Sequence, residues 1–301
     1  MKTIFPDYYK DFECINGKCR HNCCIGWEID VDDDTLKKYR AVSDGFGERL
    51  KKSISLDGQA HFVLSENERC PFLNSQNLCD IIINLGEGYL CQICDMHPRF
   101  KNELPDRVEM GLGLCCEAAG RLILSKKEAV TFPKTDTDDE IILIRDKIIE
   151  ILQNRSFSID ERINKMLGFL EVSRPDAYEW LDLFLELEML DEDWGRLLCR
   201  AKTANADFDG FEKHMKGREV EYEQLLVYFV YRHLANAPDF DSAVSRGLFA
   251  VLSYELLRFL GAVLFTEKGD FTLDDQIELA RIFSSEIEYS DENLYTILDE
   301  I

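Results

Sequence analysis

Residues 12–27 have the sequence FECINGKCRHNCCIGW, which places Cys14, Cys19, Cys23 and Cys24 within eleven positions. Three further groups follow before residue 117: Cys70 with Cys79, Cys91 with Cys94, and Cys115 with Cys116. Such a density of soft ligands predicts that the chemistry of the chain lies in its N-terminal part. Only Cys199 stands outside this block, and its apolar helical surroundings predict a core residue.

The formal net charge of −23 is distributed unevenly along the 301 residues. Residues 1–125 hold 15 Lys and Arg against 20 Asp and Glu, whereas residues 126–301 hold 20 against 38. An acidic C-terminal part repels nucleic acid and anionic membranes and attracts lysine-rich partners, so we expect neither nucleic acid nor a membrane as a partner. Because the chain has neither a secretory-type apolar leader nor an uninterrupted apolar span of about eighteen residues, we expect a cytoplasmic protein.

The cysteine count favours metal binding or redox chemistry over a disulfide scaffold. Thiols stay reduced in the cytosol, and an odd total of 11 cysteines fits poorly with complete intramolecular pairing. One tetrahedral zinc needs four ligands, and a four-iron cluster needs three or four. The thiols exceed either need, so some are spare or two centres are present, and their spacing does not separate zinc from iron–sulfur.

Local conformation decides which neighbouring thiols can share a metal. In a helix over residues 19–24, Cys19 and Cys23 would share one face, whereas in an extended segment Cys23 and Cys24 would point to opposite sides. Cys91 and Cys94 have the C-x-x-C spacing of metal knuckles and redox motifs. Trp27 is expected to pack over these loops.

Hydrophobic periodicity predicts a mainly α protein with two parts. We expect residues 1–130 to form a loop-rich, Cys-ligated metal-binding domain with a few short strands, and residues 131–301 to form an all-α helical domain. The acidic, proline-containing stretch 131–140 is the predicted boundary. In the N-terminal part we expect a helix after Asp32–Asp34, a strand at 61–64, a strand or helix at 81–83, an apolar run at 110–114 and a helix at 117–124. Beyond the boundary the predicted helices are 140–153, 158–172, 175–190, 194–203, 208–215, 220–237, 242–264 and 272–285.

Five motifs in fixed order resemble a known family. They are F-x-C-x4-C-x3-CC-x-GW at 12–27, CPFL at 70–73, LC at 78–79, YLCQICDMHPR at 89–99 and LCCEAAGRLIL at 114–124. Together they resemble the flagellin lysine N-methylase family, part of a broader group of cysteine-rich, zinc- or iron-chelating proteins. The resemblance covers roughly the first 125 residues.

This resemblance implies transfer of a methyl group from S-adenosylmethionine to lysine side chains of flagellin in the bacterial flagellum, with an iron–sulfur (4Fe–4S) cluster or zinc as the metal. Cys91 and Cys116 stand where the family is expected to have other residues, which makes them spare or accessory. Arg99 matches the family's Pro-Arg pair and is a candidate to bind the carboxylate of S-adenosylmethionine. The metal-ligating thiols implied by the motifs are Cys14, Cys19, Cys23, Cys24, Cys70, Cys79, Cys94 and Cys115.

Other methyltransferase signatures are missing. Gly111-x-Gly113 lacks the third glycine of a Rossmann fingerprint, and Cys19-x3-Cys23 runs directly into Cys24 instead of forming a radical-SAM motif. A lysine must lose its proton before it attacks a methyl group, which calls for a desolvated pocket or a nearby base. No catalytic residue is assigned, and two other functions stay open: a non-catalytic, zinc-stabilised interaction module or an iron–sulfur redox protein. The candidate bases are Tyr8, Tyr9, Glu28, Asp30 and Glu117.

Overall fold

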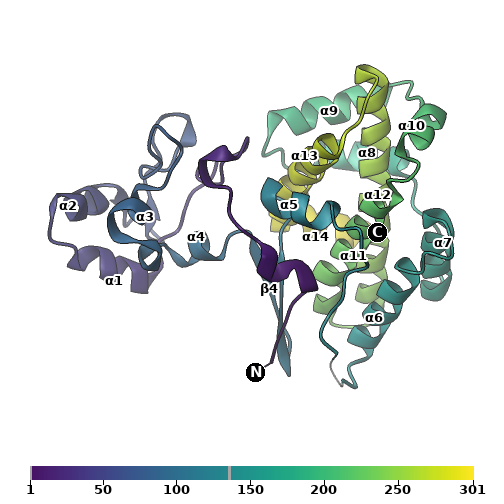
Figure 1. The fold of residues 1–301 in the computed structure, drawn as a ribbon, viewed down its shortest axis with the longest axis horizontal. Helices are drawn as coiled ribbons and strands as arrows, with labels where there is room; N and C mark the ends of the chain where they lie inside the picture. The colour runs from purple at the N-terminus through teal and green to yellow at the C-terminus, as the bar shows by residue number, and fades with distance from the viewer. Residues whose placement is uncertain (1, 135–136) are drawn as a thin grey trace. The chain divides into compact units, whose positions relative to one another are not determined.

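The computed structural model describes residues 2–134 and 137–301, which divide into two compact units. Glu13–Arg99 form the cysteine-rich unit, and residues 2–12 together with Phe100–Ile301 form the helical unit. Fourteen α-helices and five short strands are found among the described residues, so the chain is mainly α as predicted (Figure 1). The predicted boundary near residue 130 falls inside the helical unit, and residues 135–136 of that stretch lie outside the described residues.

The cysteine-rich unit joins short elements by long loops. Asp32 caps its first helix by accepting a hydrogen bond from the Thr35 backbone N–H (2.9 Å), as the run of acids predicted. Its small core includes Phe62 and Phe72, whose rings meet edge-on at 5.0 Å. The apolar run at 81–83 forms a helix. The elements are α1 (Asp33–Ala41), α2 (Gly45–Lys52), β2 (Ile54–Ser55), β3 (His61–Phe62), α3 (Asp80–Leu85) and α4 (Gln92–Met96).

The helical unit opens with a small sheet of strand order β1–β5–β4, in which β1 pairs in parallel with β5. The strands are β1 (Lys2–Ile4), β4 (Arg99–Glu103, whose first residue belongs to the other unit) and β5 (Arg107–Leu112). The helices are α5 (Glu117–Leu124), α6 (Glu140–Leu152), α7 (Ile159–Leu170), α8 (Ala177–Glu186), α9 (Glu192–Thr203), α10 (Phe208–Met215), α11 (Glu219–His233), α12 (Phe240–Lys268), α13 (Leu273–Phe283) and α14 (Asp291–Glu300). A π-helical segment, η6 (Ser284–Glu288), follows α13.

Most of these helices begin where capping chemistry predicts. Ser158 and Glu161 form the expected capping box at the start of α7. The α8 helix is capped by Asp176, so Pro175 precedes the helix instead of opening it. The last helix, α14, was not predicted, although the Ser290 side chain caps it by accepting from the Asn293 N–H (3.2 Å).

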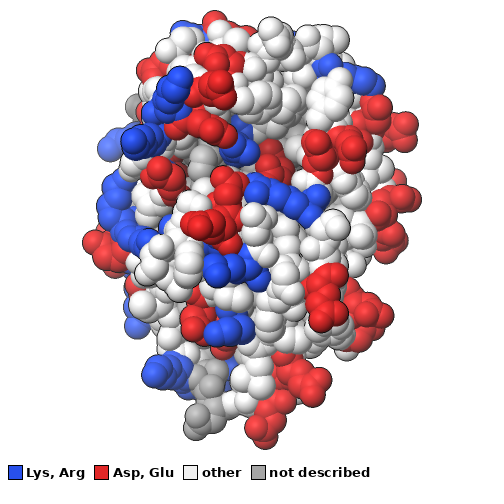
Figure 2. Space-filling view, turned by 90° about the vertical axis from the view of Figure 1, so that its right-hand side faces the viewer, with Lys and Arg blue, Asp and Glu red and all other residues white. Residues whose placement is uncertain are grey.

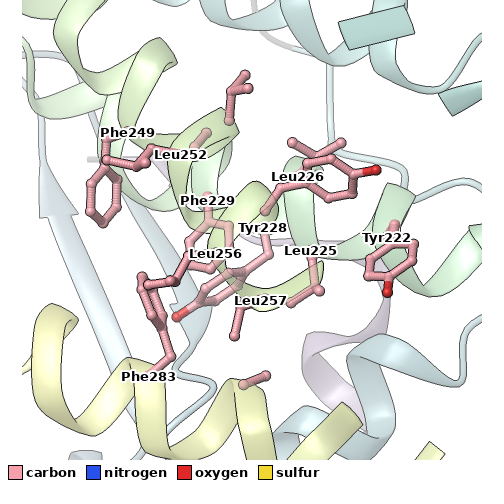
Figure 3. Close-up of a cluster of buried hydrophobic side chains, with 14 of the residues drawn as sticks. Tyr222, Leu225, Leu226, Tyr228, Phe229, Phe249, Leu252, Leu256, Leu257 and Phe283 are labelled. Carbon is pink, nitrogen blue, oxygen red and sulfur yellow. The ribbon is translucent and has the colours of Figure 1, made fainter. Parts of the chain in front are cut away.

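The core of the helical unit is built around α11 and α12. Aromatic and leucine side chains from these helices meet Phe283 of α13, and the Phe229 ring packs edge-on against Phe283 at 5.6 Å (Figure 3). By length and composition α12 is apolar enough to cross a membrane, but 67% of its most apolar window is buried inside the unit, as in a core helix. The prediction for Cys199 was wrong: α9 turns Trp194, Leu197 and Leu198 inward, which leaves Cys199 exposed.

Candidate functional site

Cys23 and Cys24 lie in a tight turn, which is neither the helix nor the extended segment considered from the sequence. The Asn22 side chain accepts a hydrogen bond from the Cys24 N–H (2.9 Å), and the Trp27 indole donates to the Cys23 carbonyl (2.7 Å). The Trp27 side chain also packs against the small core of the unit. The turn therefore holds two adjacent thiols on one side, where they hydrogen-bond to each other.

Backbone pairing brings the Cys70 segment to this turn, and the charge coupling of Cys24 with Cys94 places a further segment near it. The Cys70 N–H donates to the Cys24 carbonyl (2.8 Å), and the loop after Cys70 closes where Leu73 pairs with Cys79. Cys91 precedes α4, so the C-x-x-C spacing allows its side chain to hydrogen-bond to Cys94. We call these six residues, Cys23, Cys24, Cys70, Cys79, Cys91 and Cys94, the thiol cluster.

Electrostatic coupling links the members of the thiol cluster. A hydrogen bond from Cys24 lowers the pKa of Cys23 to about 7, and a bond from Cys94 likewise lowers the pKa of Cys91. The pKa of Cys24 and that of Cys94 are raised, first by these bonds and then by burial and by neighbouring thiolates. Burial raises the pKa of Cys70 to about 11. Each close pair therefore gives up one proton readily and holds the second tightly.

The thiol cluster includes five of the eight predicted ligands and adds Cys91. The resemblance treats Cys91 as spare, and that stays a prediction; the structure places Cys91 in the cluster, where it is fully buried and its sulfur lies 3.6 Å from the Tyr39 hydroxyl. The C-x-x-C spacing was the signal for it. Cys14 is exposed, Cys19 is half-buried in the same upstream loop, and Cys115 belongs to the helical unit.

The chemistry of this donor set suits a soft metal. Six thiols from four chain segments are the ligand type that zinc and iron–sulfur clusters use. Across residues 2–134 and 137–301, however, no three His, Cys, Asp or Glu side chains already stand in a metal-binding arrangement. The structure therefore shows a cluster of thiols with two close pairs, and metal binding by this cluster stays a prediction.

Arg99 lies at the end of the cysteine-rich unit. Its guanidinium donates to the Asp95 carbonyl (3.3 Å). The neighbouring His97 is largely enclosed, and burial, followed by the charge of Arg99, lowers the pKa of His97 to about 4. His97 is thus neutral near pH 7, and Arg99 is the cation of this segment. Its predicted part in cofactor binding stays a prediction.

Cys115 of the helical unit stands beside a second group of polar side chains, which sequence analysis missed. Burial raises the pKa of Cys115 to about 12, against the opposing effects of a hydrogen bond with Tyr289 and the charge of Arg232. The Arg232 guanidinium also lies over the Tyr289 ring, 4.7 Å from its centroid. We call Tyr228, Arg232, His233 and Glu288 the buried polar network.

Glu288 is the centre of the buried polar network. Its carboxylate accepts from the Tyr228 hydroxyl (2.9 Å), lies 2.6 Å from His233 Nε2 and pairs with the Arg232 guanidinium at 3.3 Å. Burial acts to raise the pKa of Glu288, but Arg232 and His233 outweigh it and hold that pKa below its usual value. Burial lowers the pKa of His233 despite this carboxylate. The network therefore holds one ion pair and a neutral imidazole.

The candidate bases are unequally suited to accept a proton. Burial raises the pKa of Tyr8, so Tyr8 is a neutral phenol near pH 7. Glu28 lies 3.6 Å from His61, and Glu117 opens α5 beside Cys116. None of these contacts singles out one base.

Comparisons with known proteins found one family profile, whose match lies in the helical unit, and similar bacterial proteins. The family profile described as the FliB lysine N-methylase C-terminal domain matches residues 174–301. A lysine-N-methylase of Salmonella choleraesuis and one of Salmonella typhimurium are each 28% identical over an alignment of 139 residues, and the match covers 42% of this chain and 33% of theirs. The chain thus matches about a third of the length of these relatives. No solved structure matches the chain.

A third relative is matched over most of its own length. It is the flagellar biosynthetic protein FliU of Salmonella muenchen, 30% identical over an alignment of 133 residues, and the match covers 42% of this chain and 78% of FliU. This coverage, together with the C-terminal profile, confirms the resemblance first seen in the cysteine motifs. The chain belongs to the FliB lysine N-methylase family.

Proposed function

We propose that this protein methylates lysine side chains, with S-adenosylmethionine as the methyl donor and flagellin as the modified protein, in the cytoplasm. Membership of the FliB family supports the reaction class, because two relatives are described as lysine-N-methylases. The description of FliU as a flagellar biosynthetic protein supports flagellin as the substrate. The observation that carries the proposal is the profile match over 174–301, which contains the whole buried polar network.

The proposed reaction balances without a further reactant. The lysine nitrogen, once deprotonated, forms the new N–CH₃ bond while the S–CH₃ bond of the sulfonium breaks, and S-adenosylhomocysteine leaves. The lysine proton passes to a base, since a protonated amine has no lone pair for attack. A desolvated site lowers the lysine pKa and so reduces the cost of this step.

The thiol cluster is the proposed holder of the metal, either an iron–sulfur cluster or zinc. When bound, such a centre supplies a Lewis-acidic position or, as a cluster, electron transfer. Cys23, Cys24, Cys70, Cys79, Cys91 and Cys94 supply the thiolates, and the two hydrogen-bonded pairs give up their first protons most readily. Cys14, Cys19 and Cys115 stay candidates outside the cluster.

A direct test is to incubate the anaerobically purified, metal-replete chain with S-adenosylmethionine and flagellin, and to read methyl-lysine by mass spectrometry. We expect methylated flagellin, and a Cys70→Ser variant should lose metal and activity together. Cys199→Ser is the matched control, because Cys199 is an exposed thiol far along the sequence from the cluster. If the wild-type protein neither binds S-adenosylmethionine nor methylates flagellin, the proposal is wrong.

Metal and sulfide analysis of the same sample separates this proposal from the alternatives. About four iron and four sulfide per chain would support a cluster enzyme. About one zinc without iron would indicate a structural metal and favour a non-catalytic interaction module. Iron and sulfide without binding of S-adenosylmethionine would favour a redox protein.

A further inference from the structure

The helical unit has a second feature that the proposed function does not use: an open cleft of about 620 Å³. It is lined by the aromatic rings of Tyr178, Phe208 and Phe259 and by the carboxylates of Asp160, Asp176 and Glu255. The rings come from α8, α10 and α12, and all but Asp160 of these residues lie within the segment that matches the FliB family profile. The cleft is therefore built by elements far apart in the sequence.

The aromatic wall of the cleft is open to solvent. The Phe208 and Phe259 rings stack with centroids 5.8 Å apart, and Tyr178 meets Phe259 edge-on at 6.2 Å. Tyr178 is 57% exposed and Phe208 40% exposed, whereas the Phe259 ring is half-buried beneath them. The Tyr178 hydroxyl donates to the Lys202 carbonyl (3.4 Å), which helps to hold its ring in place. Exposed aromatic rings can attract a cation through the negative charge of their π faces.

The charges of the cleft favour a cation over an anion. Its two guanidinium groups are already paired: Arg174 contacts Asp160 at 2.6 Å and Glu255 at 2.5 Å, and Arg258 pairs with Glu212 and lies 3.8 Å from Glu255. Three carboxylates and two guanidinium groups line the cleft, and Glu212 adds a fourth negative group through its pair with Arg258. Figure 2 shows one face of the molecule, where Asp and Glu side chains are interspersed with Lys and Arg and gather along one margin.

We propose that this aromatic–acidic cleft binds the alkylammonium side chain of a lysine, unmodified or methylated, in a partner protein. The rings would contact the aliphatic stem and the cationic head, and the excess carboxylate charge would complement that head. The partner is a lysine-bearing protein segment. This choice of partner rests on the proposed function, in which lysine is the substrate side chain. A carboxylate or phosphate ligand fits less well, since the carboxylates around the cleft outnumber its two guanidinium groups.

The test uses the full chain and three labelled peptides of identical sequence that carry lysine, trimethyllysine or the uncharged analogue norleucine at one position. Fluorescence anisotropy gives the dissociation constants. We expect the lysine or trimethyllysine peptide to bind and the norleucine peptide to bind at least about threefold more weakly. Comparison of the two charged peptides distinguishes recognition of the substrate side chain from recognition of the product.

Variants then locate the binding. Tyr178→Ala and Phe208→Ala should each weaken binding about three- to tenfold, and Tyr178→Phe should retain it. Tyr295→Ala, which removes an aromatic ring of similar exposure on α14, is the control and should change nothing. Circular dichroism and thermal unfolding check that each variant is folded.

Three results would overturn the inference. They are no binding of either charged peptide, binding of the norleucine peptide as tight as that of the charged peptides, or an affinity of the Tyr178→Ala and Phe208→Ala variants equal to that of the wild type. Methylation of flagellin by the wild-type protein is measured separately. Peptide binding without methylation would leave the cleft standing and refute the proposed function. Methylation without peptide binding would leave the proposed function standing and refute the inference about the cleft.

Discussion

His233 Nε2 lies 2.6 Å from Glu288 Oε1, and both residues are buried in the helical unit. This contact joins the end of α11 to the π-helical segment η6, and π-helical turns often occur at functional sites. The network continues to the Cys115 segment, because the Leu114 N–H donates to the Tyr228 hydroxyl (3.2 Å). The Cys115-Cys116 motif is thus held in place by residues more than a hundred positions away in the sequence.

The first prediction concerns the charge of Glu288. Glu288→Gln leaves Arg232 as a buried cation without its carboxylate partner, so we expect a loss of about 3–5 kcal/mol in the free energy of unfolding. Chemical denaturation measures this loss. Glu292→Gln, an exposed change in the first turn of α14, should alter stability by no more than about 0.5 kcal/mol. Equal stability of both variants would mean that the ion pair adds nothing.

The second prediction concerns Glu286, two residues earlier. Its carboxylate is buried and accepts from the Leu190 N–H (3.0 Å), while its Oε1 has no hydrogen-bond partner among the described residues. Burial raises the pKa of Glu286 to about 7. The folded protein therefore binds this proton more tightly than the unfolded chain, so its contribution to stability is complete below about pH 4.5 and is lost as the pH rises through about 7.

Glu286→Gln removes that titration. The difference in unfolding free energy between the variant and the wild type should change by about 2–3 kcal/mol between pH 4.5 and 8, in favour of the variant at the higher pH. Denaturation curves across this range measure it. A difference that stays constant with pH would show that Glu286 has an ordinary pKa in the folded state.

The sequence predicted most of the helical unit because local signals and tertiary packing agree there. The capping box of Ser158 and Glu161 and the apolar periodicity of residues 140–153 both survive in the structure. Cys199 shows the limit of this reasoning: its helix was predicted, but its neighbours Leu197 and Leu198 take the buried face. The helix α14 and the π-helical η6 were missed, and η6 has no sequence signature of the kind that a cap provides.

The candidate sites were predicted only in part. The motifs identified the thiols, but loops decide which of them meet, and loop geometry depends on side-chain bonds such as that from the Cys24 N–H to Asn22. Neither the buried polar network nor the aromatic–acidic cleft has a motif, because each joins residues from several helices. Tyr178 and Phe259 are 81 positions apart, and only the packing of α8 on α12 brings them together.

The third prediction concerns Cys91, which the structure adds to the thiol cluster. Cys91→Ser should lower the bound metal about as much as Cys94→Ser does, because the two side chains form one hydrogen-bonded pair. Metal analysis of anaerobically purified protein measures this. Cys199→Ser should keep the wild-type metal content. Full metal occupancy in Cys91→Ser would show that Cys91 is a spare thiol, as the family resemblance implies.

The last prediction concerns Gly111, which belongs to the incomplete Rossmann glycine motif of the sequence. Its role is steric: a Cβ at this position of β5 would overlap the ring of Phe100 on the neighbouring strand β4. Gly111→Ala should therefore destabilise the protein by about 1–3 kcal/mol, and Phe100→Leu in the same chain should recover part of that loss by making room. Chemical denaturation of the two single variants and the double variant measures the coupling.

Gly168→Ala is the control, because that exposed position in α7 has open space around it. This change should stabilise the protein by about 0.5–1 kcal/mol through helix propensity. Strict additivity of the Gly111 and Phe100 changes would rule out the overlap as the reason for glycine.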